Sequence, residues 1–333
     1  MQTSFPPFPV HRPRRLRARE AIRRLVSENS LSASDLIWPV FVHENEGMPI
    51  PVSSMPGVSR LSIGQVVDAA QQAAELGIPA IALFPSVDSS LKTSGCEEAW
   101  NPENLANRAA RAVRLAVPAI EVMLDVALDP YNSDGHDGLL RNGEILNDET
   151  LDCLERQALC HAEAGATILG PSDMMDGRIA RIRSALEDHG HDGVVILSYA
   201  SKFASAFYGP FRDAVGSMGT LKGNKSTYQI DPGNSDEAVR MAMRDIQEGA
   251  DAVMVKPGMP YLDICRRISD LGAAPTFAYQ VSGEYAMIRH AADKGCLDLE
   301  SVVLESLLAF KRAGCVGILS YFAPFAAGLL NRG

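Results

Sequence analysis

Several features typical of secreted, membrane-spanning and nucleic-acid-binding proteins are missing from this sequence. No apolar run reaches the ~18 residues that a membrane-spanning helix needs, and the first residues lack the apolar core of a secretory signal. Acidic residues outnumber basic ones, 41 to 31, which gives a net charge of −10 and disfavours general nucleic-acid binding. We therefore expect a cytoplasmic protein whose partners include neither a membrane nor a nucleic acid.

Paired cysteines are also missing. None of the six cysteines forms a CxxC motif, and their spacing fits neither a zinc knuckle nor a disulfide framework. Cys153 and Cys160 are seven residues apart, so we expect them to share one helix face and to pack as small apolar side chains. Reduced thiols in a cytosolic protein fit this pattern best.

The N-terminus differs in composition from the rest of the chain. Residues 1–33 are rich in proline and arginine, and we expect an extended arm that packs on a neighbouring subunit. A transit peptide and an RNA-binding tail are the alternatives. The chain is 46% hydrophobic, so residues 34–333 can bury a large core, and no low-complexity linker divides them.

One pattern repeats through residues 34–333: a short apolar run ends in a polar or glycine-containing loop, and an amphipathic segment follows. Eight such runs occur, at 36–42, 80–86, 121–127, 167–172, 194–200, 252–258, 276–282 and 317–323. Alternating strands and helices indicate a parallel sheet, and eight units favour a closed (β/α)₈ TIM barrel. A doubly wound open sheet is the main alternative, but no GxGxxG follows the first run. The longest irregular stretch, 201–232, is expected to be a functional lid.

Two lysines stand at predicted strand ends, where the active sites of TIM barrels lie. Lys202 follows the run VVILSYAS, and Lys256 ends AVMVK. A snorkelling side chain or a salt bridge explains one such lysine equally well, but two in one barrel weaken that explanation. A desolvated lysine beside another cation has a depressed pKa, and its neutral amine attacks ketones to form imines. The pair therefore predicts Schiff-base chemistry on a carbonyl substrate.

Groups that bind carboxylates are present in the predicted lid and at two further strand ends. The lid carries Arg212, Lys222, Lys225 and Gln229. Arginine binds carboxylates through its planar fork and lysine adds a mobile point charge, although an ordinary solvated loop has the same composition and is the preferred explanation for Lys222. Ser282 and Tyr321 can donate hydrogen bonds to a second carboxylate, but either one alone is more typical of a structural hydroxyl.

The segment 125–138, DVALDPYNSDGHDG, is dense in carboxylates. Such a segment suits a hard cation, although glycine is not at the sixth position that an EF-hand requires. Asp125 lies nearest the strand end and is the best general-base candidate. Asp129, Asp134 and Asp137 serve equally well as turn residues.

Four strings of this sequence resemble the porphobilinogen synthase (5-aminolevulinate dehydratase) family over about residue 16 to the C-terminus. They are LSYASKFASAFYGPFRDA, AVMVKPGMPYLDI, AYQVSGEYAMI and ILSYFAPFAA, in the family's order and spacing. The resemblance implies a TIM barrel with an N-terminal arm. It also implies the condensation of two 5-aminolevulinate molecules to porphobilinogen with loss of two waters, an early step of tetrapyrrole biosynthesis.

The resemblance assigns roles to the candidate residues. Lys256 would form an imine with the substrate that becomes the propionate side of the product, and Lys202 would hold the second substrate as an imine. Asp125, with Ser172 nearby, would handle the amino group and proton transfers. The expected substrate-binding set comprises Ser282 and Tyr321 for the first carboxylate, Arg212, Lys225 and Gln229 for the second, and Phe211.

This sequence differs from some members of the family at the residues that bind metals. Zinc-dependent members carry three cysteines where this chain has Ala127, Asp129 and Asp137, and without thiolates such a zinc site cannot form. Many other members hold an allosteric magnesium through a glutamate, where this chain has Met241, a poor magnesium ligand. We expect no required metal, with magnesium or a monovalent cation at most a non-essential activator. If a metal binds, Asp129, Asp137 and Glu237 are the candidate ligands, with Asp236 able to substitute.

The resemblance also implies a homo-oligomer built from arm-exchanged dimers, either a hexamer or an octamer. Two other functions compete with the predicted one. A class I aldolase-type barrel also uses a lysine imine but needs only one essential lysine, and a non-catalytic RNA-binding scaffold would use the basic N-terminus. The second lysine and the two carboxylate-binding groups argue against both alternatives, although a barrel alone specifies no function.

Overall fold

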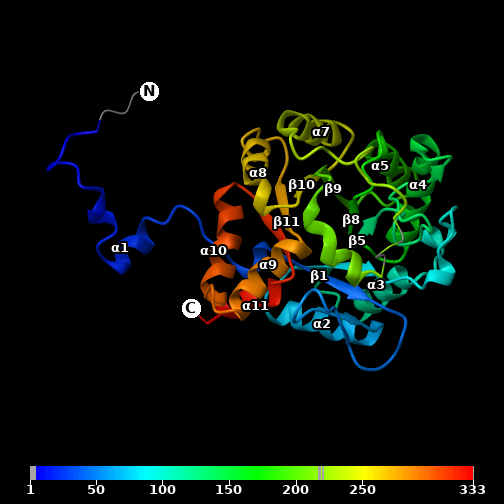
Figure 1. The fold of residues 1–333 in the computed structure, drawn as a ribbon, viewed down its shortest axis with the longest axis horizontal. Coiled ribbons are helices and arrows are strands. Elements are labelled where there is room, and N and C mark those ends of the chain that lie inside the picture. Colours follow the sequence, from blue (N-terminus) through cyan, green and yellow to red (C-terminus); the bar gives the residue numbers. More distant parts are fainter. Residues whose placement is uncertain (1–4, 217–218, 220, 333) are drawn as a thin grey trace. The chain divides into compact units, whose positions relative to one another are not determined.

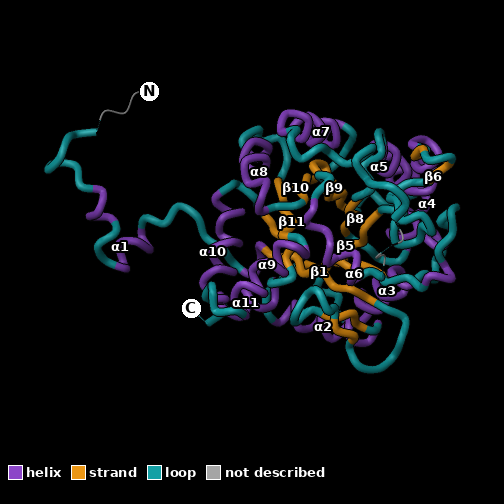
Figure 2. Tube along the Cα trace, viewed as in Figure 1, coloured by secondary structure: helices purple, strands orange, loops and turns teal. Residues whose placement is uncertain are grey.

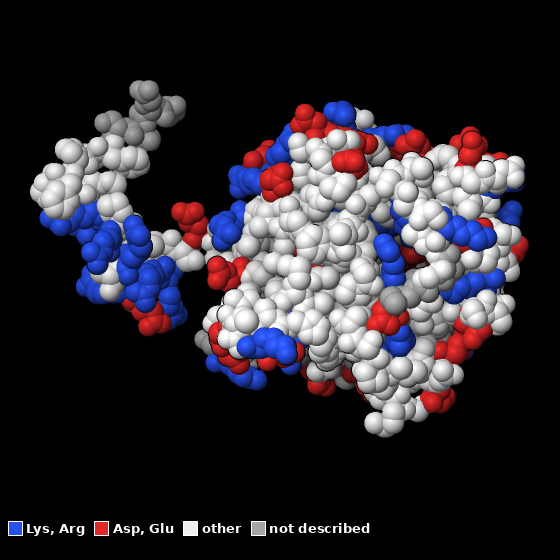
Figure 3. Space-filling view, in the orientation of Figure 1, with Lys and Arg blue, Asp and Glu red and all other residues white. Residues whose placement is uncertain are grey.

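The computed structural model describes residues 5–216, 219 and 221–332 and divides the chain into two units, 1–30 and 31–333. The smaller unit contains a 3₁₀ helix, Pro13–Leu16, and the short helix α1, Glu20–Leu25, both mostly exposed. Basic side chains cover much of its surface (Figure 3). Residues 1–4 of the predicted arm and residues 217, 218 and 220 of the predicted lid lie outside the described part of the chain.

The larger unit is a closed barrel of eight parallel strands. The pairing order along the chain is continuous, and the last strand pairs with the first through Leu36–Ile318 and Ile37–Leu319. The barrel strands are β1 Leu36–Val42, β4 Ala80–Pro85, β5 Glu121–Val126, β8 Ile168–Pro171, β9 Val195–Lys202, β10 Ala252–Lys256, β11 Thr276–Gln280 and β12 Gly317–Ser320. All eight predicted runs therefore form strands, and the predicted TIM barrel is confirmed (Figure 1).

Helices surround the strands (Figure 2). They are α2 Ile63–Glu75, α3 Leu105–Ala116, α4 Asn147–Glu163, α5 Arg178–Asp188, α6 Gly209–Ala214, α7 Ser235–Gln247, α8 Leu262–Ser269, α9 Ser282–Asp293, α10 Leu299–Arg312 and α11 Ala323–Leu330. Strands β4 and β10 are buried along their whole length, because apolar side chains pack both inside the barrel and against these helices. This double burial explains why the strands read as continuous apolar runs.

Local capping sets where several helices begin. The Ser62 hydroxyl accepts the Gln65 amide and the Gln65 side chain accepts the Ser62 amide, which forms a capping box at the start of α2. Asp298 accepts the Ser301 amide and caps α10 in the same position. These caps satisfy backbone donors that have no partner inside the helix.

Two pairs of short strands lie outside the eight barrel strands. Strand β3, Ser59–Leu61, pairs with the end of β1 and carries β2, Ile50–Pro51, on its other edge. A hairpin of β6, Leu140–Arg141, and β7, Glu144–Ile145, follows β5.

Cys153 and Cys160 are both buried on α4 as free thiols. Among the described residues, no helix combines the length and the apolar character required to cross a membrane.

Candidate active site

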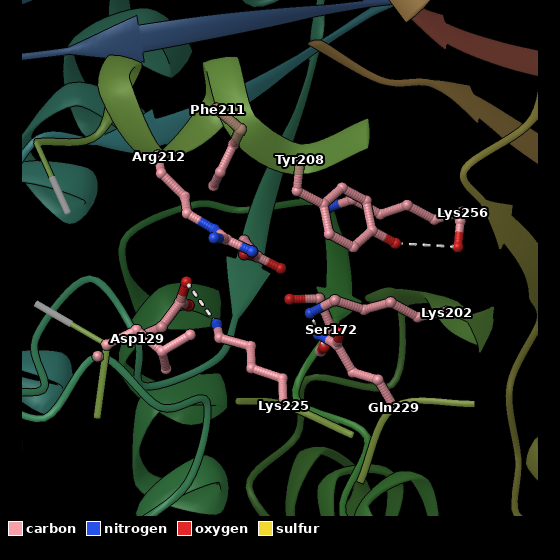
Figure 4. A pocket seen from close by; sticks show the side chains of 12 residues that line it. Asp129, Ser172, Lys202, Tyr208, Phe211, Arg212, Lys225, Gln229 and Lys256 are labelled. Carbon is pink, nitrogen blue, oxygen red and sulfur yellow. Dashed lines mark hydrogen bonds and ion pairs between the residues drawn. The ribbon is translucent and has the colours of Figure 1, made fainter. Parts of the chain in front are cut away.

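The two predicted lysines lie side by side at the carboxyl end of the barrel. Lys202 is the last residue of β9, Lys256 is the last residue of β10, and the two are direct partners in the parallel pairing. Residues at the same register position of adjacent strands point to the same side of the sheet. Both side chains enter one pocket, where each residue is at most 7% exposed (Figure 4).

Aromatic rings surround the Lys256 amine. Its Nζ lies 4.9 Å from the ring centres of Tyr199 and Tyr279, 5.3 Å from that of Phe211 and 5.5 Å from that of Tyr208. Burial and the nearby Lys202 ammonium lower the pKa of Lys256 to about 7, although nearby carboxylates partly oppose this shift. A large fraction of this amine is therefore neutral, and nucleophilic, near neutral pH.

The Lys202 amine has polar partners instead. It donates a hydrogen bond to the Ser172 carbonyl and lies 3.5 Å from Oδ1 of the buried Asp137. Burial alone would raise the pKa of Asp137, but Lys202, Lys225 and hydrogen bonds from Lys225 and Tyr228 lower it to about 2. Asp137 is thus an ionised counter-charge for two lysines.

Asp125 is the penultimate residue of β5, and it lines the pocket together with Ser172. Burial raises the pKa of Asp125 to about 6, against the opposing effect of the lysines. Its Oδ1 is buried without a hydrogen-bond partner among the described residues. A carboxyl group with a raised pKa and a free oxygen atom is suited to accept and return a proton near neutral pH.

The predicted lid carries cationic and amide groups into the pocket. Arg212 and Phe211 come from α6, whereas Lys225 and the buried Gln229 follow it in the chain (Figure 4). The Lys225 amine lies 3.1 Å from Asp137 and 3.5 Å from Asp129. Burial alone would lower the pKa of Lys225, yet these two carboxylates raise it. The three predicted groups for the second carboxylate therefore converge on one pocket.

Two predicted site residues lie apart from this pocket lining. The Ser282 hydroxyl, on the first residue of α9, accepts a hydrogen bond from the Phe211 amide at 2.9 Å. The Tyr321 hydroxyl is 2.9 Å from that of Tyr279, and Tyr321 lines a different cavity, with Trp38. Both hydroxyls are buried and already have protein partners.

The candidate metal ligands do not all lie in one place. Asp129 and Asp137 both contact the Lys225 ammonium, which occupies the position that a cation between them would take. Glu237 lines a separate cavity that also contains Met241, and it accepts a hydrogen bond from Asn234. Within residues 5–216, 219 and 221–332, no group of three or more His, Cys, Asp or Glu side chains is placed to hold a metal ion.

Three tyrosines of the site were not singled out by the sequence patterns. Tyr199 and Tyr279 come from the interiors of β9 and β11, and Tyr208 comes from the 3₁₀ turn Ala206–Tyr208 before α6. The Tyr208 hydroxyl donates to the backbone carbonyl of Lys256 at 3.1 Å (Figure 4). Aromatic residues at inward strand positions beside a strand-end lysine are the signal that could have identified Tyr199 and Tyr279.

A buried arginine lies in a polar network next to the site. Arg178 is 1% exposed, donates to Asp245 at 2.9 Å, and its Nε lies 3.5 Å from Asp173 Oδ2. Asp173 directly follows Ser172, whose carbonyl binds Lys202. This network connects β8, α5 and α7, and its members are too far apart in the sequence to suggest it.

Comparison with known proteins identifies the family. The model of the delta-aminolevulinic acid dehydratase family matches residues 10–329. The chain belongs to this family. It is 56% identical over 326 residues to the delta-aminolevulinic acid dehydratase of Rhodobacter capsulatus, covering 98% of each chain. It is 58% identical over 320 residues to that of Bradyrhizobium diazoefficiens, covering 96% of this chain and 91% of the relative.

A solved structure extends the comparison to three dimensions. The delta-aminolevulinic acid dehydratase (porphobilinogen synthase) from Toxoplasma gondii, in complex with the reaction product porphobilinogen, is 48% identical to this chain. It matches with a TM-score of 0.94 over 96% of this chain and 91% of that one. The family predicted from the four sequence strings is thereby confirmed, and this member of the delta-aminolevulinic acid dehydratase family is an enzyme of the lyase class.

Proposed function

We propose that this chain condenses two molecules of 5-aminolevulinate to porphobilinogen through imines on Lys256 and Lys202. The observation that carries the proposal is the placement of both lysines, in register, in one pocket of a chain of this family. If the chain were a single-lysine aldolase, the second amine would have no role. If it were an RNA-binding scaffold, the whole pocket would have no role. Holding both substrates together removes the entropic cost of their encounter.

The two lysines account for both waters that the reaction releases. Each amine adds to one substrate ketone, and that ketone oxygen leaves as water when the imine forms. The carbon–carbon bond then forms between the two bound substrates. Ring closure through the amino group of one substrate forms the carbon–nitrogen bond, and both lysines depart as amines. Each lysine is therefore regenerated, and two waters are lost for each product formed.

The surrounding groups suit the remaining steps. Arg212, Lys225 and Gln229 offer cationic and amide donors to the carboxylate of the second substrate. Asp125, with Ser172 beside it, suits proton transfer to and from the reacting carbon and amino groups.

The carboxylate of the first substrate requires a local change near Phe211. We assign that carboxylate to Ser282 and Tyr321, whose hydroxyls now bind the Phe211 amide and Tyr279. A carboxylate that displaces these partners would receive two hydroxyl donors. The Phe211 ring, 5.3 Å from the Lys256 amine, would have to move as the substrate enters.

We further propose that the enzyme requires neither zinc nor magnesium. The ammonium of Lys225 between Asp129 and Asp137, and Met241 beside Glu237, support this proposal. The test is conversion of 5-aminolevulinate to porphobilinogen by metal-stripped protein in EDTA, with zinc, magnesium or nothing added back. Full turnover with nothing added is expected. Turnover only with magnesium would retain the activity and refute metal independence, and no turnover under any condition would refute the proposed function.

We also infer a homo-oligomer in the cytoplasm. The basic arm, whose residues 5–30 are mostly exposed, supports a role in subunit contacts, and the free cysteines support a reducing compartment. Sedimentation of the full chain and of a chain that lacks residues 1–30 tests the role of the arm. The truncated chain is expected to form smaller assemblies. An unchanged assembly state would contradict that role.

A further inference from the structure

The lid helix α6 is fastened at its C-terminal end by a segment outside the pocket. Oδ2 of Asp213 accepts hydrogen bonds from the Ser53 hydroxyl at 3.0 Å, the Ser54 amide at 3.2 Å and the Ser54 hydroxyl at 2.6 Å. The hydrogen bond from Ser54, more than any other contact, lowers the pKa of Asp213. One carboxylate oxygen of the lid thus binds both serines of the loop between β2 and β3.

Arg60 adds a second, independent attachment. It lies on β3, opposite Phe41 of β1, so its backbone is part of the barrel sheet. Its guanidinium donates to the backbone carbonyls of Asp213 and Ala214 and lies 3.6 Å from the Asp213 carboxylate. The last carbonyls of a helix have no partner inside it and carry partial negative charge, so an arginine at this end stabilises the helix.

These contacts are shielded from solvent more than most surface ion pairs. The Arg60 and Asp213 side chains are 17% and 25% exposed. Because this ion pair is partly buried and shares several hydrogen bonds, it contributes more to stability than an exposed ion pair does. The turn Ala206–Tyr208, which leads into α6, also packs closely on α9, because a Cβ added to Gly283 would clash with the Phe207 carbonyl.

We propose that Arg60 and Asp213 are positioning residues that fix Arg212 in the pocket as the binding group for the carboxylate of the second substrate. Arg212 directly precedes Asp213, so a fixed helix end limits where its guanidinium can reach. The segment 50–61 contributes nothing to the lining around the two lysines, so its effect on that pocket passes through α6. This inference rests on the proposed function.

Preorganisation explains how a distant contact changes substrate binding. An arginine on a loose helix end samples many conformations, and binding a carboxylate would then have to order both the helix and the side chain. With the helix end held, only the side chain is ordered. Releasing the attachment therefore weakens binding of the second substrate, whereas imine formation at Lys256 with the first substrate is unaffected.

The test compares Arg60→Met, Asp213→Ala and Arg60→Lys with the wild-type chain. Arg266→Met is the matched control, because Arg266 of α8 makes an exposed ion pair with Asp270, the residue that follows this helix. The measurements are kcat and KM for 5-aminolevulinate, thermal unfolding, and borohydride trapping of substrate on each lysine, read by peptide mass spectrometry. Loss of a charged hydrogen bond is expected to raise KM about tenfold in Arg60→Met and Asp213→Ala, with a smaller change in kcat.

The trapping experiment separates positioning from general damage. Substrate trapped on Lys202 is expected to fall while that on Lys256 is unchanged, with the midpoint of unfolding close to that of Arg266→Met. Arg60→Lys, which keeps the positive charge but loses the planar fork of donors, is expected to lie between wild type and Arg60→Met. Unchanged KM and trapping, or equal losses at both lysines with a lowered unfolding midpoint, would overturn the inference. An inactive wild-type enzyme would instead refute the proposed function.

Discussion

The two lysines of the pocket have different surroundings. Lys256 projects among aromatic rings from β9, β11 and the segment 208–211, whereas Lys202, its direct neighbour in the sheet, contacts a backbone carbonyl and the ionised Asp137. The two residues have the same type, the same strand-end position and similar burial. What differs is the set of groups around each amine, so the environment and not the residue type assigns the roles.

The pKa of Lys256 depends on the charge of Lys202, which in turn depends on Asp137. The Lys202 charge is the largest cause, after burial, of the lowered pKa of Lys256. Asp137 lies within 3.5 Å of the Lys202 amine and keeps that charge compensated in a buried place. The acidic loop after β5, in which sequence patterns predicted either a metal site or turn residues, thus supports the nucleophile through Lys202.

Replacing the nucleophile has the largest expected effect. Lys256→Met is expected to reduce turnover by about 10⁴-fold or more, because no other amine faces the first substrate from that position. Steady-state assays of porphobilinogen formation measure the loss, and borohydride trapping should find no substrate on residue 256. Lys256→Arg serves as the charge-preserving control and should be equally inactive, since a guanidinium forms no imine. Residual activity above 1% in either variant, estimated as about 3 kcal/mol of lost transition-state stabilisation, would contradict the account.

Two substitutions of Lys202 sharpen the comparison. Both are expected to lower turnover by roughly 10²–10³-fold, because neither side chain can form the second imine. They should differ at Lys256. Lys202→Arg keeps the positive charge and should leave the pKa of Lys256 low, whereas Lys202→Met removes the charge and should raise it. The pH dependence of trapping at Lys256 measures this difference, and identical profiles in the two variants would show that Lys202 does not influence Lys256.

The pH dependence of the wild-type enzyme follows from the two shifted groups. Lys256, with a pKa of about 7, must be neutral to attack, and Asp125, with a pKa of about 6, must be ionised to accept a proton. Below pH 7, kcat/KM is therefore expected to fall roughly tenfold per pH unit, and more steeply below pH 6. A profile that stays flat down to pH 5 would exclude both assignments.

Removal of the shared counter-charge has the smallest expected effect. Asp137→Asn leaves Lys202 and Lys225 without their common carboxylate, and KM is expected to rise about threefold to tenfold as both amines lose their fixed positions. Asp134→Asn is the matched control, because Asp134 pairs with Lys222, whose side chain is 69% exposed. Equal KM values for the two variants would mean that Asp137 has no special role.

The barrel could be predicted from the sequence because its strands are buried on both faces. Runs such as AVMVK are apolar without alternation, and each is followed by an amphipathic segment that forms a helix. The sequence pattern did not predict helices α5, α9 and α11. Helix α5 is rich in arginine, and α9 and α11 begin within or just after apolar runs. Strand ends were accordingly placed up to three residues too late at β11 and β12.

The site could be predicted only in part. Strand-end position identified Lys202, Lys256 and Asp125, because the barrel topology alone brings such residues together. The tyrosines around Lys256 and the position of Lys225 between two aspartates depend on how the closed barrel and the lid pack, which no local pattern encodes. The present partners of Ser282 and Tyr321 likewise depend on where the lid helix lies.

The central claim is that burial and the neighbouring Lys202 lower the pKa of Lys256 to about 7, so that a large fraction of its amine is neutral near neutral pH. The most direct test is the pH dependence of imine formation at Lys256, measured by borohydride trapping of 5-aminolevulinate on wild-type protein and quantified on the peptide that contains residue 256. The account predicts a midpoint near pH 7, with trapping complete above it. A midpoint near 10.5, the ordinary pKa of lysine, would contradict it.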